Sequence, residues 1–228
     1  DQDLFAYQSH IKAMHAIDNG FFKSGILPIE VEEVYLDENQ KKQHRKFTID
    51  TDEGVRRDTT PEGLAKLKPA FAVNGTVTAG NASQTSDGAA FVMVMSEKMV
   101  NELGLKPIGR LVNVAVSGVH PRIMGIGPVE AIPKVLKKTG LNLQDIDLIE
   151  LNEAFAAQAC AVNKDMGWDP ARVNVNGGAI AIGHPIGASG ARILNTLLFE
   201  MGRSGAKKGL ATLCIGGGMG VAMCLERG

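Results

Sequence analysis

Residues 209–226 read Gly209-Leu210-Ala211-Thr212-Leu213-Cys214-Ile215-Gly216-Gly217-Gly218-Met219-Gly220-Val221-Ala222-Met223-Cys224-Leu225-Glu226. Two apolar runs flank a glycine-rich segment, which predicts strands over residues 209–214 and 221–226. Because the connection between them is short, we expect the strands to be antiparallel neighbours in one sheet. This pair is the centre from which the rest of the fold is built.

Upstream of the pair, apolar strands alternate with amphipathic helices. We expect strands over residues 111–117, 148–151 and 173–176, and helices over residues 129–139, 154–166 and 191–201. Such alternation predicts a layered α/β fold with helices packed on a sheet. A further apolar run, residues 88–95, predicts a strand covered on both faces, followed by a helix over residues 98–103.

The first fifth of the chain has another pattern. Apolar residues at spacings of three and four predict a helix from Leu4 to Ile17 with an aspartate cap. Strands are expected over residues 26–36 and 47–49, with the basic residues 41–46 on a solvated hairpin edge between them.

Residues 52–81 have little periodicity and predict loops around one short helix near residues 62–66. Loops of this kind frequently hold ligands. The chain starts abruptly in a helical pattern, and we expect it to be a fragment of a longer protein.

Composition excludes several classes of protein. With 228 residues, 44% of them hydrophobic, and a net charge of −1, the chain is expected to be a globular, cytoplasmic protein without a nucleic-acid or membrane partner. No apolar run approaches the roughly 20 residues that a membrane helix needs. The three cysteines form no CxxC pair, so we expect a reducing compartment and neither disulfides nor a bound metal.

Three strand ends carry residues that could do chemistry, since catalytic groups in α/β sheets lie beyond strand ends. His184 stands in a run with five glycines, residues 176–190, and can titrate near neutral pH, although a loop histidine is frequently structural. Cys214 precedes glycines whose N–H groups could bind an oxyanion, although a buried, inert thiol is as good a reading. Asn152 follows a strand, where capping the next helix is the simpler role.

Nucleotide-binding signatures are missing from these segments. The glycine-rich run after Cys214 has no G-x-G-x-x-G spacing and leads into a strand rather than a helix, and no Walker A lysine is present. A nicotinamide enzyme and a P-loop nucleotidase are therefore poor interpretations.

Taken together, three segments closely resemble the motifs of the thiolase family in content, order and spacing. They are Asn152-Glu153-Ala154-Phe155-Ala156, the run of residues 177–190 around Gly183-His184-Pro185, and Cys214-Ile215-Gly216-Gly217-Gly218-Met219-Gly220. Residues 75–83 and Ser86-Asp87-Gly88-Ala89-Ala90 resemble the family's segment beneath bound coenzyme A. The likeness spans nearly the whole chain.

The resemblance implies a thiolase-like layered αβαβα fold with two related α/β halves. On that template residues 1–86 would be part of the loop domain that covers coenzyme A, residues 87–106 the end of the N-terminal half, and residues 107–228 the C-terminal domain. It also implies a homodimer or homotetramer. The family's acyl-accepting cysteine would lie outside this chain, and Cys160 and Cys224 are expected to be buried, apolar side chains.

The resemblance implies an acetyl-CoA C-acyltransferase, with coenzyme A and acetyl-CoA as substrates and no cofactor. His184 would hold the missing cysteine as thiolate, and Cys214 would protonate the acetyl-CoA enolate. His184 and a water on Asn152 would form one oxyanion hole, and the Gly216 N–H would contribute to the other. The residues implied to bind coenzyme A are Arg56, Leu67, Phe71, Ser83, Met124 and Phe155.

The length of the hairpin and the residues 83–87 look more like a fatty-acid-degrading 3-oxoacyl-CoA thiolase than a short-chain acetoacetyl-CoA enzyme. Two alternatives stay open. One is a condensing enzyme that acts on acyl carrier protein, whose triad usually has a second histidine. The other is a non-catalytic thiolase-like protein that binds acyl-CoA. The 228-residue chain alone is expected to be inactive.

Overall fold

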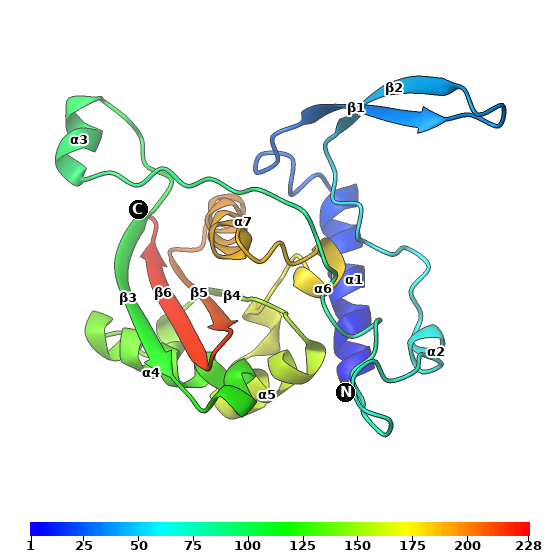
Figure 1. The fold of residues 1–228 in the computed structure, drawn as a ribbon. Coiled ribbons are helices and arrows are strands. Elements are labelled where there is room, and N and C mark those ends of the chain that lie inside the picture. Colours follow the sequence, from blue (N-terminus) through cyan, green and yellow to red (C-terminus); the bar gives the residue numbers. More distant parts are fainter.

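A four-stranded sheet is the centre of the computed structural model, which describes residues 1–228 (Figure 1). Its strands are β3 (Arg110–Gly118), β4 (Leu148–Leu151), β5 (Lys208–Ile215) and β6 (Met219–Glu226), in the order β3-β6-β5-β4. The β5–β6 pair is antiparallel, which confirms the prediction from its short connection. β3 is antiparallel to β6, and β4 runs parallel to β5.

Helices cover both faces of the sheet. Leu210 of β5 packs in a core with α4 (Gly127–Thr139) and α5 (Ala156–Met166), whereas the next residue, Ala211, packs with α7 (Ser189–Ser204). Successive side chains of a strand point to opposite faces, so α4 and α5 lie on one face and α7 on the other. The three layers are therefore an α/β/α arrangement, as the alternating pattern predicts.

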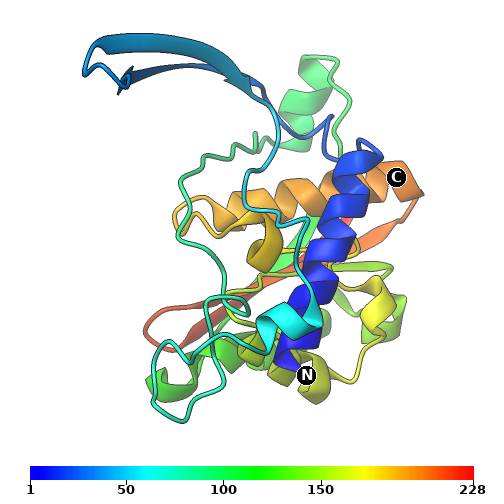
Figure 2. The ribbon, with the colours of Figure 1, turned by 90° about the vertical axis from the view of Figure 1, so that its right-hand side faces the viewer.

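A long N-terminal helix, α1 (Gln2–Asp18), runs along the side of these layers and contacts α5 and the short α6 (Ala179–Ile182) (Figure 2). Its contact face is made of small side chains, with Ala6 and Ala13 fully buried, so the helix packs closely. No helix is long and apolar enough to cross a lipid bilayer.

A two-stranded hairpin, β1 (Ile29–Leu36) and β2 (Lys42–Ile49), projects away from the layers. The basic residues lie on this solvated hairpin, as predicted, but the second strand begins at Lys42 and not at Phe47, so they are paired with β1. Glu32 bonds to His44 and Glu33 to Arg45 across the strands, because β1 supplies opposite charges.

The remaining elements are short. They are the helices α2 (Pro61–Leu64) and α3 (Glu97–Glu102) and the 3-10 turns η1 (Pro121–Ile126), η2 (Leu143–Asp145) and η3 (Pro170–Arg172). The predictions of single helices near residues 62–66 and 98–103 are thereby confirmed.

Two predicted strands do not form. Residues 88–95 are extended without a neighbouring strand, and Phe91 is 86% exposed, since an apolar run becomes a strand only where another strand pairs with it. At residues 173–176 the side chain of Asn174 makes the hydrogen bonds to β4 that the backbone of a neighbouring strand would make. Asn174 has a φ of 45°, and its amide accepts from the Leu151 N–H and donates to the Leu151 carbonyl.

Candidate active site

Asn152 and Cys214 lie at the same edge of the sheet. Because β4 and β5 are parallel, their carboxyl ends coincide, and the Asn152 N–H donates to Thr212 O on β5 at 3.0 Å. Asn152 is fully buried and does not cap α5, whose N-cap position is taken by Phe155. The capping role is therefore wrong, because the helix starts three residues later than the cap would require.

His184 reaches this edge from the glycine-rich loop after α6. Its Nε2 lies 3.3 Å from Asn152 Nδ2, and its Nδ1 lies 2.5 Å from Ser189 Oγ at the start of α7. Its backbone N–H donates to Ser86 Oγ. Gly183 has a φ of 102°, and a Cβ there would lie 2.4 Å from Ser86 Oγ, so the loop requires glycine at this position.

The hydrogen-bond partners determine the tautomer of His184. Arg192 Nη2 donates to Asn152 Oδ1 at 3.1 Å, and since a guanidinium only donates, the Asn152 NH₂ group must face His184. His184 Nε2 is then the acceptor and Nδ1 carries the proton. That proton goes to Ser189 Oγ, whose own hydroxyl donates to Pro185 O at 3.0 Å. His184 is thus a neutral base with its free lone pair at Nε2.

The surroundings move both titrating groups away from their ordinary behaviour. Burial, and secondly the positive charge of Arg192, lower the pKa of His184. Burial raises the pKa of the Cys214 thiol. At neutral pH the site therefore holds a neutral imidazole that can accept a proton and a protonated thiol that can give one.

The β5–β6 turn offers a free backbone donor. Gly217 and Gly218 have φ values of 89° and 94°, and a Cβ on Gly218 would lie 2.3 Å from Val119 O. Glycine is therefore required for this turn. Gly216 is an exposed residue and its N–H donates to no acceptor within the chain, so this N–H is available to a ligand oxygen.

Four of the residues implied to bind coenzyme A lie in one neighbourhood. Phe71 and Phe155 meet edge to face with ring centroids 5.9 Å apart, and Ser83 Oγ donates to Ala154 O beside Phe155. Leu67 packs against Gly80, three residues before Ser83. The loop residues 67–83 therefore join the start of α5.

Arg56 and Met124 are placed by other elements. The Arg56 N–H donates to His10 Nδ1 on α1 at 3.2 Å, and the guanidinium is exposed without an ion pair in the chain. Met124 lies half-buried on η1, whose Gly125 packs against Gln158 of α5.

The sequence did not single out several residues that hold the site in place. Glu153 is buried and accepts from Ser9 Oγ, Asn174 Nδ2 and the Ile180 N–H, which ties α1 and α6 to the end of β4. Ser189 and Arg192 were also missed. A signal existed for Arg192, since a cation in the first turn of a helix opposes the helix dipole and indicates a specific role.

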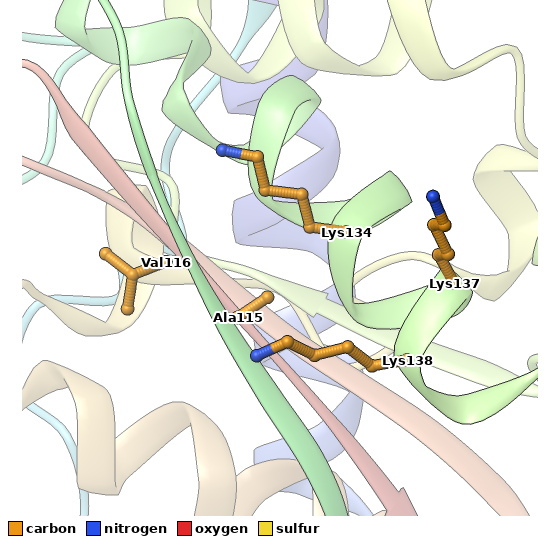
Figure 3. Close-up of a pocket in the computed structure, with 5 residues that line it drawn as sticks. All are labelled: Ala115, Val116, Lys134, Lys137 and Lys138. Carbon is orange, nitrogen blue, oxygen red and sulfur yellow. The ribbon is translucent and has the colours of Figure 1, made fainter.

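A surface hollow of about 430 Å³ lies away from these residues. It lies between β3 and α4 and is lined by Ala115, Val116, Lys134, Lys137 and Lys138 (Figure 3). Lys138 Nζ donates to Val114 O at 2.9 Å. None of Asn152, His184 and Cys214 borders this hollow.

Comparison with known proteins covers both parts of the chain. Residues 1–98 match the model of the thiolase N-terminal domain and residues 105–227 that of the thiolase C-terminal domain. An acetyl-CoA acetyltransferase of Shinella zoogloeoides is 58% identical over 226 residues, which are 99% of this chain and 55% of that protein. The chain thus spans about half the length of the curated relatives it matches.

Solved structures agree. A Bacillus anthracis acetyl-CoA acetyltransferase superposes with a TM-score of 0.93 at 48% identity, over 99% of this chain and 55% of that one. A human mitochondrial 3-ketoacyl-CoA thiolase in complex with CoA superposes with a TM-score of 0.89 at 44% identity, over 100% and 54%. These matches confirm the layered α/β fold expected from the resemblance, and the chain belongs to the thiolase family.

Proposed function

We propose that this chain supplies the acid–base half of a thiolase site, which reversibly cleaves a 3-oxoacyl-CoA to acetyl-CoA and a shortened acyl-CoA. The observation that carries the proposal is the hydrogen-bond chain from Arg192 through Asn152 to His184, at the sheet edge that also bears Cys214. Membership of the thiolase family supports it.

The reaction needs a nucleophile for the keto carbon, and none of the cysteines outside the site is suited to that task. Cys224 is fully buried in β6 and Cys160 is half-buried on α5, and burial raises the pKa of both thiols. The proposal therefore requires a cysteine thiolate from outside residues 1–228, with its proton held by His184.

In cleavage, that thiolate attacks C3 of the substrate and the C2–C3 bond breaks. The electron pair becomes the enolate of acetyl-CoA, and the acyl group stays on the cysteine as a thioester. The Cys214 thiol gives its proton to C2 and is left as thiolate. This thiolate then takes the proton of coenzyme A, whose sulfur attacks the acyl-cysteine and releases the shortened acyl-CoA. The nucleophilic thiolate is regenerated, so protons and electrons balance.

The 3.3 Å approach of Asn152 Nδ2 and His184 Nε2 has a chemical use in this sequence. Once Nε2 is protonated, both groups are donors and can no longer bond to each other. Both can then turn to one acceptor, the thioester oxygen that becomes the enolate, directly or through a water held by Asn152. The unpaired Gly216 N–H would stabilise the other oxyanion, on C3.

Coenzyme A and acetyl-CoA are substrates in this proposal, and neither a bound cofactor nor a metal takes part. Arg56 would bind the nucleotide phosphates, Ser83 the pantetheine, and the aromatic pair Phe71 and Phe155 would line its channel with Leu67 and Met124. A similar solved structure is described as a complex with CoA, which supports coenzyme A as the ligand. We also propose that the protein is a cytoplasmic homodimer or homotetramer. Within the chain, we propose domain boundaries after residues 86 and 106.

A role in fatty-acid degradation is the finer part of the proposal. It rests on the long β1–β2 hairpin and on residues 83–87, and a 3-ketoacyl-CoA thiolase is among the similar structures. A second candidate is the two-carbon reaction, condensation of two acetyl-CoA to acetoacetyl-CoA. The 58% identity to an acetyl-CoA acetyltransferase favours it.

Thiolysis by the complete protein tests the proposal, measured as loss of the 3-oxoacyl-CoA absorbance with substrates of four to sixteen carbons. Turnover that requires both coenzyme A and the 3-oxo group is expected. Binding of acetoacetyl-CoA without turnover would contradict the proposal and favour a non-catalytic acyl-CoA-binding protein, and turnover only with acyl carrier protein would favour a condensing enzyme. A preference for long chains separates the degradative role from the acetoacetyl-CoA reaction. Purified residues 1–228 should be inactive, since they lack the nucleophile.

A further inference from the structure

Arg192 occupies a position that does not favour folding. It is the fourth residue of α7, where the helix dipole disfavours a cation. Its Nε and Nη1 atoms are buried and have no hydrogen-bond partner. Unpaired buried donors destabilise a protein, so the guanidinium is not explained by its contribution to stability.

The one hydrogen bond that this guanidinium makes is directed at the site. Arg192 Nη2 donates to Oδ1 of the fully buried Asn152 at 3.1 Å. An amide can be turned by 180° with little change in shape. In the turned state the Asn152 NH₂ would face the Arg192 donors, and Oδ1 would face His184 Nε2 and favour the tautomer with a proton there. That histidine could not accept a proton at Nε2.

The carboxyl groups near Arg192 act on it only through space. Glu150, Glu153 and Asp52 interact with its charge, but none comes close enough to bond to Nε or Nη1. Glu150 lies on β4 two residues before Asn152, and its own Oε2 is buried without a partner. The guanidinium is therefore oriented toward the Asn152 amide and forms no hydrogen-bonded ion pair.

We propose that Arg192 is a positioning residue of the active site, which fixes the Asn152 amide with its N–H groups toward His184 and so selects the Nδ1-protonated tautomer. Ser189 supports the same tautomer from the other side of the ring, since its hydroxyl already donates to Pro185 O. The kinetic consequence rests on the proposed thiolase function, whereas the tautomer itself does not.

The test uses Arg192→Met and Arg192→Lys, with Arg110→Met, an exposed arginine of β3, as the matched control. In the complete protein we expect kcat of Arg192→Met to fall at least tenfold with KM for coenzyme A changed less than twofold. The lysine variant should recover part of the loss. Burial, and secondly the charge of Arg192, lower the pKa of His184, so loss of that charge should move the acidic limb of kcat/KM to higher pH in the methionine variant, and the lysine variant should keep it in place.

A second readout does not depend on activity. In chains labelled with ¹⁵N-histidine, His184 should show one Nδ1-protonated neutral tautomer, and a mixture of tautomers in Arg192→Met. An inactive wild-type protein with this tautomer switch would reject the thiolase function and keep the proposal. Unchanged kcat, acidic limb and tautomer in a folded Arg192→Met would overturn it. If that variant does not fold, Arg192→Gln decides, because its side chain is too short to reach Asn152: a tautomer mixture supports the proposal, and a single wild-type tautomer overturns it.

Discussion

Asn152 Nδ2 lies 3.3 Å from His184 Nε2, although the two residues are 32 positions apart and come from different elements. Asn152 follows β4, and His184 follows α6. The contact places an amide donor on the lone pair that accepts a proton in the proposed reaction. Two of the four predictions below change this pair or a group that orients it.

Replacement of Asn152 by alanine removes one oxyanion donor. Loss of one such donor typically raises a barrier by about 3 to 4 kcal/mol, so turnover should slow by about two to three orders of magnitude. The measurement is kcat for thiolysis in the complete protein. Asn101→Ala, on the exposed face of α3, is the control and should leave kcat unchanged. An unchanged rate in Asn152→Ala would remove this residue from the mechanism.

Replacement of Ser189 by alanine takes away the acceptor of the His184 Nδ1 proton. A hydrogen bond between neutral groups contributes about 0.5 to 1.5 kcal/mol, so kcat should fall by about two- to tenfold. Ser204→Ala removes a hydroxyl from the other end of α7 and should have no effect on kcat. Equal rates for the two variants would mean that Ser189 does not orient the imidazole.

Glu150 should make the stability of the fold depend on pH. Burial raises its pKa from 4.5 to about 8, so the folded chain binds a proton that the unfolded chain has released between these values. The free energy of unfolding should therefore decrease as pH rises from about 4.5 to about 8, and then level off.

Chemical denaturation across this pH range measures the effect. Glu150→Gln should make the decrease smaller, because glutamine has no proton to lose, while Glu153, whose pKa burial also raises, keeps its own part of it. Glu130→Gln, on the exposed side of α4, should retain it. The same pH dependence in Glu150→Gln and in the wild type would show that another group is responsible.

Much of the fold could be predicted because its information is local. The β5–β6 pair and α4 have apolar residues at the periods of a strand and a helix, and the structure places them as expected. The strand predicted over residues 88–95 does not form, because an apolar run does not indicate whether a neighbouring strand exists. The strand predicted over residues 173–176 does not form, because the Asn174 side chain bonds to the Leu151 backbone. No sequence pattern predicts that a side chain takes the place of backbone hydrogen bonds between strands.

The site divides in the same way. His184 stood out through its glycine-rich setting, and Cys214 through the glycines after it. Asn152 was assigned a simpler capping role, since the position of a helix start could not be fixed to within three residues. Arg192 and Ser189 act only through contacts made in the folded chain, so their roles were visible once α7 was placed beside the end of β4.

The separate rates of two exchange reactions test the central claim most directly. With acetyl-CoA in D₂O, the complete protein should exchange methyl protons for deuterium through Cys214, and exchange labelled coenzyme A through the nucleophilic cysteine and His184. In Cys214→Ala the rate of methyl exchange should fall at least about a hundredfold, and the rate of coenzyme A exchange should fall far less. Only methyl exchange requires proton transfer by Cys214. Cys224→Ala, in the same hairpin, should retain both. Methyl exchange at the wild-type rate in Cys214→Ala, or an equal loss of both rates, would contradict the account.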